Sequence, residues 1–218
     1  MKGLIKNNFY TSLSSAKWLG VILAFLGAFV VIVDNSIPNL LIGYIFLSMV
    51  GFSINALASL RKQSSSKWEK YKLTAPIRRA DILISYFLSQ VIWLAVGIVF
   101  AAVCITLSIL LHGFPFDRGT DVLMLFTTGI SVSLLMCAAF FPLFYLTSEE
   151  KNEVVLIASL LIAIVFIMVL VSLINRFFGP NITFLQVLAG AGIIILSAIL
   201  ALTLSYPLTN LIFKRKDY

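Results

Sequence analysis

The side chains best suited to covalent or metal chemistry are few in this chain and stand far apart in its sequence. His112 is the only histidine, and the two cysteines, Cys104 and Cys137, both fall inside apolar stretches. A metalloprotease-like centre needs several histidine or carboxylate ligands that converge on one ion, and the acidic pair Glu149–Glu150 has no histidine in the apolar stretches to complete such a set. The G-x-x-x-x-G-K-[ST] loop that binds ATP phosphates is also missing. The sequence therefore predicts no catalytic residue, no metal site and no cofactor on this chain.

The segment with the most specific pattern is polar and reads SSSKWEKYKLTAPIRRADIL, at positions 64–83. Ser66 and Glu69 have the spacing of a capping box, in which the serine side chain accepts from the third helical N–H and the glutamate reaches back. Pro76 disfavours the helical conformation for the residue before it, so we expect a short helix over Lys67–Leu73. A helix this short is not stable alone. It must dock either among lipid head groups, where tryptophan and tyrosine are common, or in a groove of a cytosolic partner.

Small residues recur every four positions near the start of the chain, and a helix would place them on one face. They are Ala16, Gly20, Ala24 and Ala28. In lipid such a stripe lets two backbones approach closely, because dispersion contacts rather than the exclusion of water drive helix association. We expect the stripe to pack against another helix of the same chain or against a second subunit.

Both the predicted short helix at 67–73 and the stripe of small residues must be positioned by helices that cross a membrane. The chain is 61% hydrophobic and 11% charged, with a mean hydropathy of +1.06, whereas a soluble domain is about 25% charged. A bilayer core needs roughly 20 apolar residues per helix, and six apolar stretches follow one another here. They are residues 18–33, 38–60, 82–111, 122–146, 154–174 and 184–213. The predicted fold is an all-α membrane domain over 1–218, with a cytosolic loop at 61–81.

The first 17 residues have a different pattern from the spans. Ile5, Phe9 and Leu13 recur at spacings of four, while Lys2 and Lys6 lie elsewhere on the helical wheel. This pattern is typical of a short amphipathic helix that lies at the membrane surface.

Basic residues are distributed unevenly between the two sides of the predicted membrane. Of the 16 lysine and arginine residues, 14 fall in the N-terminus, the C-terminus, 61–81 and 148–153, which six spans place on one side. Only Arg118 and Arg176 fall on the other side. Because basic residues in short loops stay in the cytosol, both termini are expected to be cytosolic. The net charge of +7 is thereby assigned to topology and anionic lipid rather than to nucleic acid.

Together these patterns resemble the membrane subunits of type-2 ABC exporters, in their short bacterial forms. The resemblance rests on the amphipathic lead, on six spans with both ends inside, and on three short motifs before the third span. The motifs are Lys67-Trp68-Glu69, Thr74-Ala75-Pro76 and the basic pair Arg78-Arg79. Among relatives, the chain looks most like permeases that export amphipathic antimicrobial or cytolytic peptides, such as phenol-soluble modulins.

The resemblance implies specific partners and a location. The capped segment is similar to a coupling helix that docks on a separate ATPase subunit, and the residues it would supply are Ser66, Lys67, Trp68, Glu69, Lys70, Tyr71, Lys72 and Leu73. ATP and magnesium would be held by that partner. Two permeases, alike or different, would pair with two ATPases in the plasma membrane of a bacterium.

Two classes of function therefore remain. The first is an export permease driven by ATP hydrolysis on a partner, and the second is the substrate-capture membrane subunit of a vitamin or metal importer. The tryptophan-containing capped helix favours the first. Because the spans contain almost no ionisable residue, a path for a small ion is not expected, and the best cargo is amphipathic or lipid-like, with a membrane-active peptide first.

Overall fold

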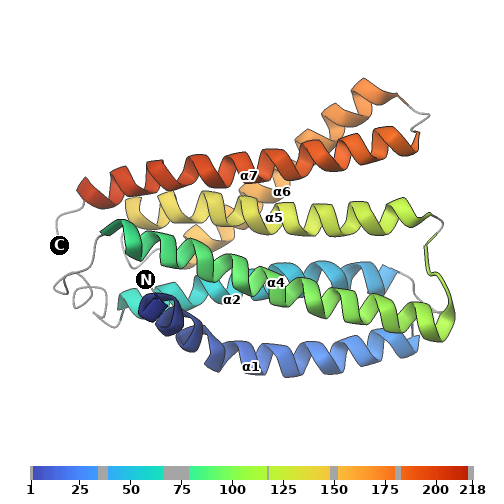
Figure 1. Ribbon diagram of the computed structural model, residues 1–218, viewed down its shortest axis with the longest axis horizontal. Coiled ribbons are helices and arrows are strands. Elements are labelled where there is room, and N and C mark those ends of the chain that lie inside the picture. The colour runs from blue at the N-terminus through green and yellow to red at the C-terminus, as the bar shows by residue number, and fades with distance from the viewer. Residues whose placement is uncertain are drawn as a thin grey trace.

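The computed structural model describes residues 2–33, 39–65, 79–116, 118–147, 152–179 and 183–215, and these ranges are almost entirely helical (Figure 1). They form α1 (Lys2–Val33), α2 (Asn39–Ser65), α4 (Arg79–His112), α5 (Gly119–Leu146), α6 (Asn152–Phe178) and α7 (Phe184–Arg215). Each of these helices contains a stretch long and apolar enough to cross a membrane. The expected all-α fold with six spanning helices is confirmed.

The observed helices cover the expected spans and extend beyond most of them. Apart from Pro38, which lies outside the described residues, every predicted span falls inside one helix. The 34 residues of α4 give a length of about 51 Å at 1.5 Å per residue. A bilayer core is only about 30 Å thick, so α4 must tilt or project beyond the hydrocarbon.

The amphipathic lead differs from its prediction because it does not form a helix of its own. α1 runs without interruption from Lys2 to Val33 and so joins the lead to the first span. Its first turns lie at an angle to the rest of the helix (Figure 1). Asn8 and Ser12, which an interfacial helix would leave in contact with water or head groups, are buried against the other helices.

The helices alternate in direction, so that the two chain ends lie at the same end of the bundle (Figure 1). α1, α2 and α4 pack against one another, while α5 packs most extensively against α7 and also against α6. Contact between α2 and α5 joins the two groups. Fully buried aromatic side chains fill the interior, among them Phe52, Phe140, Phe141 and Phe213.

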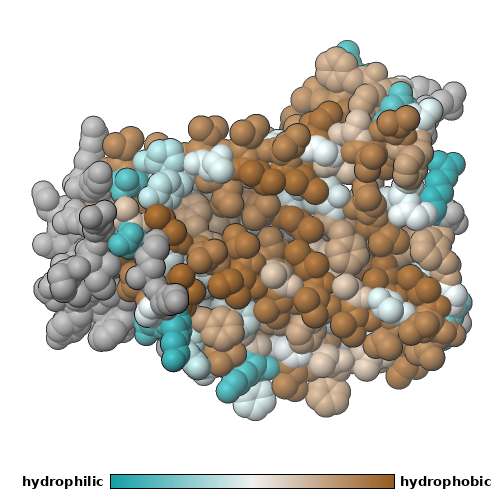
Figure 2. Space-filling view, in the orientation of Figure 1, coloured by the Kyte–Doolittle hydropathy of each residue, from teal (hydrophilic) through white to brown (hydrophobic). Residues whose placement is uncertain are grey.

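Apolar side chains cover most of the visible outer surface, and hydrophilic ones gather toward its two ends (Figure 2). Large exposed hydrophobic residues occur on every helix, and α6 is especially rich in them, with Leu161, Ile162 and Val165 as examples. Exposure of such a large apolar surface to water would be unfavourable. It suits contact with lipid chains, as expected of a membrane-spanning bundle.

Candidate functional site

The segment predicted to contact a partner, residues 66–73, lies outside the described residues, between the end of α2 at Ser65 and the start of α4 at Arg79. Its two flanking helices meet in close backbone contact. A Cβ atom added to Gly97 would lie 2.7 Å from the Ser48 carbonyl oxygen and 2.9 Å from the Met49 Cα. Any larger residue at position 97 would force the two backbones apart, so glycine sets the spacing of α2 and α4 at this point.

A buried polar cluster joins α1 to the same pair of helices, and it consists of Asn8, Ser12, Asn55, Ser59 and Ser85. The Asn8 Nδ2 donates to the Ser85 Oγ at 3.0 Å, and the Ser12 and Ser59 hydroxyls share a hydrogen bond. The Asn55 Nδ2 donates to the Ser12 carbonyl oxygen at 3.4 Å. Hydrogen bonds between membrane helices contribute about 0.6 kcal/mol on average. The cluster therefore fixes the first turns of α1 onto the end of α2 and the start of α4, the two helices that flank residues 66–73.

Aromatic rings continue this contact toward the middle of the bundle. The Trp93 ring of α4 stacks between Phe9 of α1, with centroids 5.1 Å apart, and Phe52 of α2, with centroids 6.0 Å apart. The Trp93 Nε1 and both amide atoms of the neighbouring Gln90 are buried without a hydrogen-bond partner in the described part of the chain. Unpaired buried polar groups cost about 1–3 kcal/mol each, so this interior would gain from a polar group supplied by another molecule or another conformation.

The predicted stripe of small residues divides into two parts. Ala16 is buried within the chain, and a Cβ atom on Gly20 would be in ordinary contact with the Phe100 and Phe52 rings at 3.7 and 4.0 Å. Ala24 and Ala28 are exposed and line a cavity. The first half thus packs inside the subunit, and a role for the second half in a dimer stays a prediction.

Other glycines, outside the predicted stripe, make closer helix contacts than Gly20 does. Besides Gly97, a Cβ atom on Gly27 would lie 2.8 Å from the Tyr44 hydroxyl, and one on Gly129 would lie 2.6 Å from the Met49 Sδ. Two of them have a small residue four positions later, since Ala101 follows Gly97 and Ser133 follows Gly129. This small-residue spacing was the signal that could have identified them.

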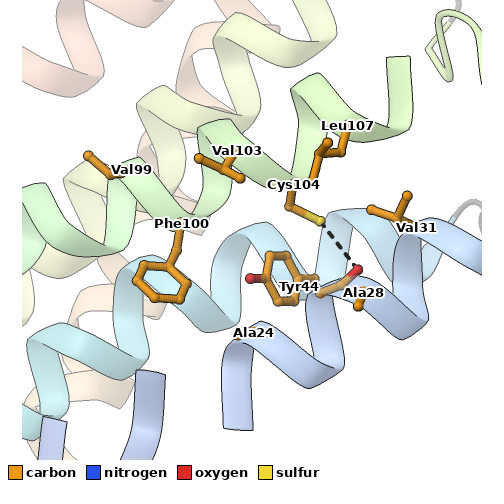
Figure 3. Close-up of a pocket in the computed structure, with 10 residues that line it drawn as sticks. Ala24, Ala28, Val31, Tyr44, Val99, Phe100, Val103, Cys104 and Leu107 are labelled. Atoms are coloured by element: carbon orange, nitrogen blue, oxygen red, sulfur yellow. Dashed lines mark hydrogen bonds between the residues drawn. The ribbon is translucent and has the colours of Figure 1, made fainter. Parts of the chain in front are cut away.

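The cavity beside Ala24 and Ala28 has a volume of about 320 Å³ and lies between α1, α2 and α4. Figure 3 shows the hydrogen bond that the Cys104 Sγ donates to the Gly27 carbonyl oxygen, at 3.9 Å, with the Tyr44 ring nearby. Val99 and Val103, on the α4 side, are more than half exposed. The cavity therefore opens toward the lipid and offers an almost wholly apolar wall.

The described residues contain no group of three or more histidine, cysteine or acidic side chains that could hold a metal ion. The histidine, His112, has its Nε2 2.8 Å from the Val31 carbonyl oxygen, which ties the far ends of α1 and α4 together. Cys104 and Cys137 are both buried free thiols. The geometry of the described residues thus supports helix packing and contact with lipid.

Comparison with known proteins then identifies the family. The model of the ABC-2 family transporter proteins matches residues 3–214, which is nearly the whole chain. The chain belongs to the ABC-2 family. No curated protein and no solved structure matches it.

Family membership makes this ABC-2 protein a multi-pass permease subunit of an ABC transporter. It also favours an ABC permease over the substrate-capture membrane subunit of an importer. ABC-2 permeases work with an ABC ATPase. The end of α2, the start of α4 and the start of α1 lie together at one end of the bundle (Figure 1).

Proposed function

We propose that this ABC-2 permease exports an amphipathic substrate, with a membrane-active peptide as the best candidate, using ATP hydrolysed by a separate subunit. The observation that carries the cargo assignment is the apolar middle of the bundle. Asp81, Asp121 and Glu153 lie in the first turns of their helices, and Arg176 lies in the last turn of α6. Because none of the six predicted spans contains a lysine, arginine or acidic residue, they favour a cargo that offers a large apolar face.

An amphipathic helical peptide fits this description because it already lies in the membrane interface with its apolar face buried. It could enter between helices from the lipid, where the exposed faces of α6 and α7 are apolar. A water-filled vestibule is not needed for such a route.

Energy would reach the spans through residues 66–73, which we assign to contact with the ATPase that holds ATP and magnesium. Closure of the ATPase pair would push on this segment, and α2 and α4 would move together because they touch at Gly97. The polar cluster would carry the first turns of α1 with them. In this proposal two permeases, identical or different, pair with two ATPases in a bacterial plasma membrane, with both termini in the cytosol.

The decisive test is ATP-dependent uptake of an amphipathic helical peptide into inverted vesicles that contain the permease and its ATPase. We expect accumulation with ATP and none with an ATPase variant that binds but does not hydrolyse ATP. Cells lacking the permease should also retain more peptide and become more sensitive to it. Right-side-out vesicles that accumulate the peptide would contradict the export direction.

Lipid and drug probes in the same vesicles test the peptide cargo independently of the assignment as an ABC permease. A lipid or drug signal without peptide accumulation would contradict the peptide assignment and leave the ABC permease assignment standing.

A further inference from the structure

The outer face of α1 carries a basic and aromatic groove that the transport proposal does not use. The groove has a volume of about 540 Å³ and is lined by Tyr10, Ser14, Lys17 and Trp18, among others. Tyr10 is 58% exposed and Trp18 is 74% exposed, and the Lys6 ammonium lies 5.8 Å from the centre of the Tyr10 ring. Tryptophan, tyrosine and lysine are the side chains that sit at the level of lipid head groups. Because α1 contains no acidic residue, the groove suits an anionic group.

A continuous stripe connects this groove to the apolar cavity between α1 and α4. Lys17, Val21, Ala24 and Ala28 follow one another at spacings of three and four, so they lie on one face of the helix. The first two line the groove and the last two line the cavity. The buried residues of α1, such as Leu23, lie on the other side of the helix.

The length of the stripe matches the depth of one lipid leaflet. From Lys17 to Ala28 the axial distance is about 16 Å at 1.5 Å per residue, and half of a bilayer core is about 15 Å. A phosphate beside Lys17 would therefore place the end of its acyl chain at the level of the cavity. The small side chains of Ala24 and Ala28 leave room for that chain.

We infer that an anionic phospholipid binds along α1, with its phosphate between Lys17, Ser14 and Tyr10 and one acyl chain in the cavity between α1 and α4. A second copy of the chain is a poorer occupant of this face. In a two-fold dimer the same patch meets itself, and since this patch has no acidic residue, Lys17 would be buried without a counter-charge.

The test titrates the full purified chain in detergent with phosphatidylglycerol and phosphatidylcholine of identical acyl chains and counts bound lipid by native mass spectrometry. The wild type should prefer phosphatidylglycerol. Lys17→Gln should lower the affinity for phosphatidylglycerol about fivefold, as expected for one lysine near an anionic head group, and leave phosphatidylcholine unchanged. Ala28→Phe, which fills the cavity, should lower the affinity for both lipids.

Matched controls lie on helices away from this stripe. Arg176→Gln removes an exposed cation from α6, and Ala189→Phe enlarges an exposed alanine on α7. Both should leave lipid binding unchanged. Ala28→Leu repeats the cavity test with a smaller side chain, and thermal unfolding confirms that each variant is folded.

Three results would overturn the inference. Equal losses from Lys17→Gln and Arg176→Gln would show a general charge effect. Unchanged lipid binding by folded Ala28→Phe, together with a changed oligomeric mass, would assign the face to a second copy. Full displacement of the lipid by soluble glycerol phosphate would show that the acyl chain contributes nothing.

Discussion

At the scale of single residues, the glycines that hold the helices together differ in what they touch. The neighbours of Gly97 are backbone atoms of Ser48 and Met49, which cannot move without moving α2. The neighbour of Gly129 is the Met49 sulfur, near the end of a flexible side chain that can turn away. A methyl group is therefore much harder to accommodate at position 97 than at position 129.

Gly97→Ala tests this difference. We expect it to lower the free energy of unfolding by about 1–3 kcal/mol, the usual cost of overpacking, because α2 and α4 must separate. Thermal unfolding in detergent measures the loss. Gly43→Ala on α2 is the control, since a Cβ atom there meets nothing within 4 Å. Equal unfolding temperatures for the two variants would contradict a backbone contact at Gly97.

At the scale of elements, the sequence predicts the spans well because each one is a long apolar run, and hydropathy alone reveals such runs. It could not predict that the lead and the first span form one helix. The pattern of Ile5, Phe9 and Leu13 describes an amphipathic helix, but only the fold places Ser85 of α4 opposite Asn8 and so buries that polar side chain. The stripe of small residues has the same ambiguity, since the repeat identifies a face of α1 and not the partner of that face.

The ATPase contact that we propose for residues 66–73 rests on the sequence pattern of that segment. Trp68→Ala and Tyr71→Ala should weaken association with the ATPase and abolish transport, because these rings are the largest apolar surfaces that the predicted helix would offer. Glu69→Ala should cause a partial defect, since it removes half of the capping box and loss of a good cap costs about 0.5–2 kcal/mol. Co-purification with the ATPase and vesicle transport measure both effects.

Phe177→Ala is the control for the loss of a large ring, because Phe177 is 85% exposed near the other end of the bundle. It should leave ATPase binding intact. Normal transport by the Trp68 and Tyr71 variants would reduce the segment to an element of the lipid interface.

At the scale of the whole molecule, the bundle has two distinct ends. The chain termini share one end, while Arg118 precedes α5 and Arg176 closes α6 at the other (Figure 1). The distribution of basic residues predicts which end faces the cytosol. The fold shows which residues lie at each end and can therefore be labelled to test that prediction.

Single cysteines in a background without Cys104 and Cys137 test the orientation. Cysteines at positions 118 and 176 should react with a membrane-impermeant thiol reagent on intact cells, while cysteines at positions 65 and 216 should react only after the cells are opened. Positive charge in short loops stays inside, which is the reason for this expectation. The opposite labelling pattern would reverse the assigned orientation.

The packing of α5 has a consequence for how the protein is made. α5 buries polar side chains, including Thr127, Ser131 and Ser133, and its most extensive neighbour is α7. On the ribosome, α5 is synthesised before α7, with the largely lipid-exposed α6 between them. During that interval α5 enters the bilayer without the helix that covers it best, and its polar residues rely on α2, α4 or the insertion machinery for cover. We therefore expect the second half of the bundle to be complete only after α7 has been inserted beside α5.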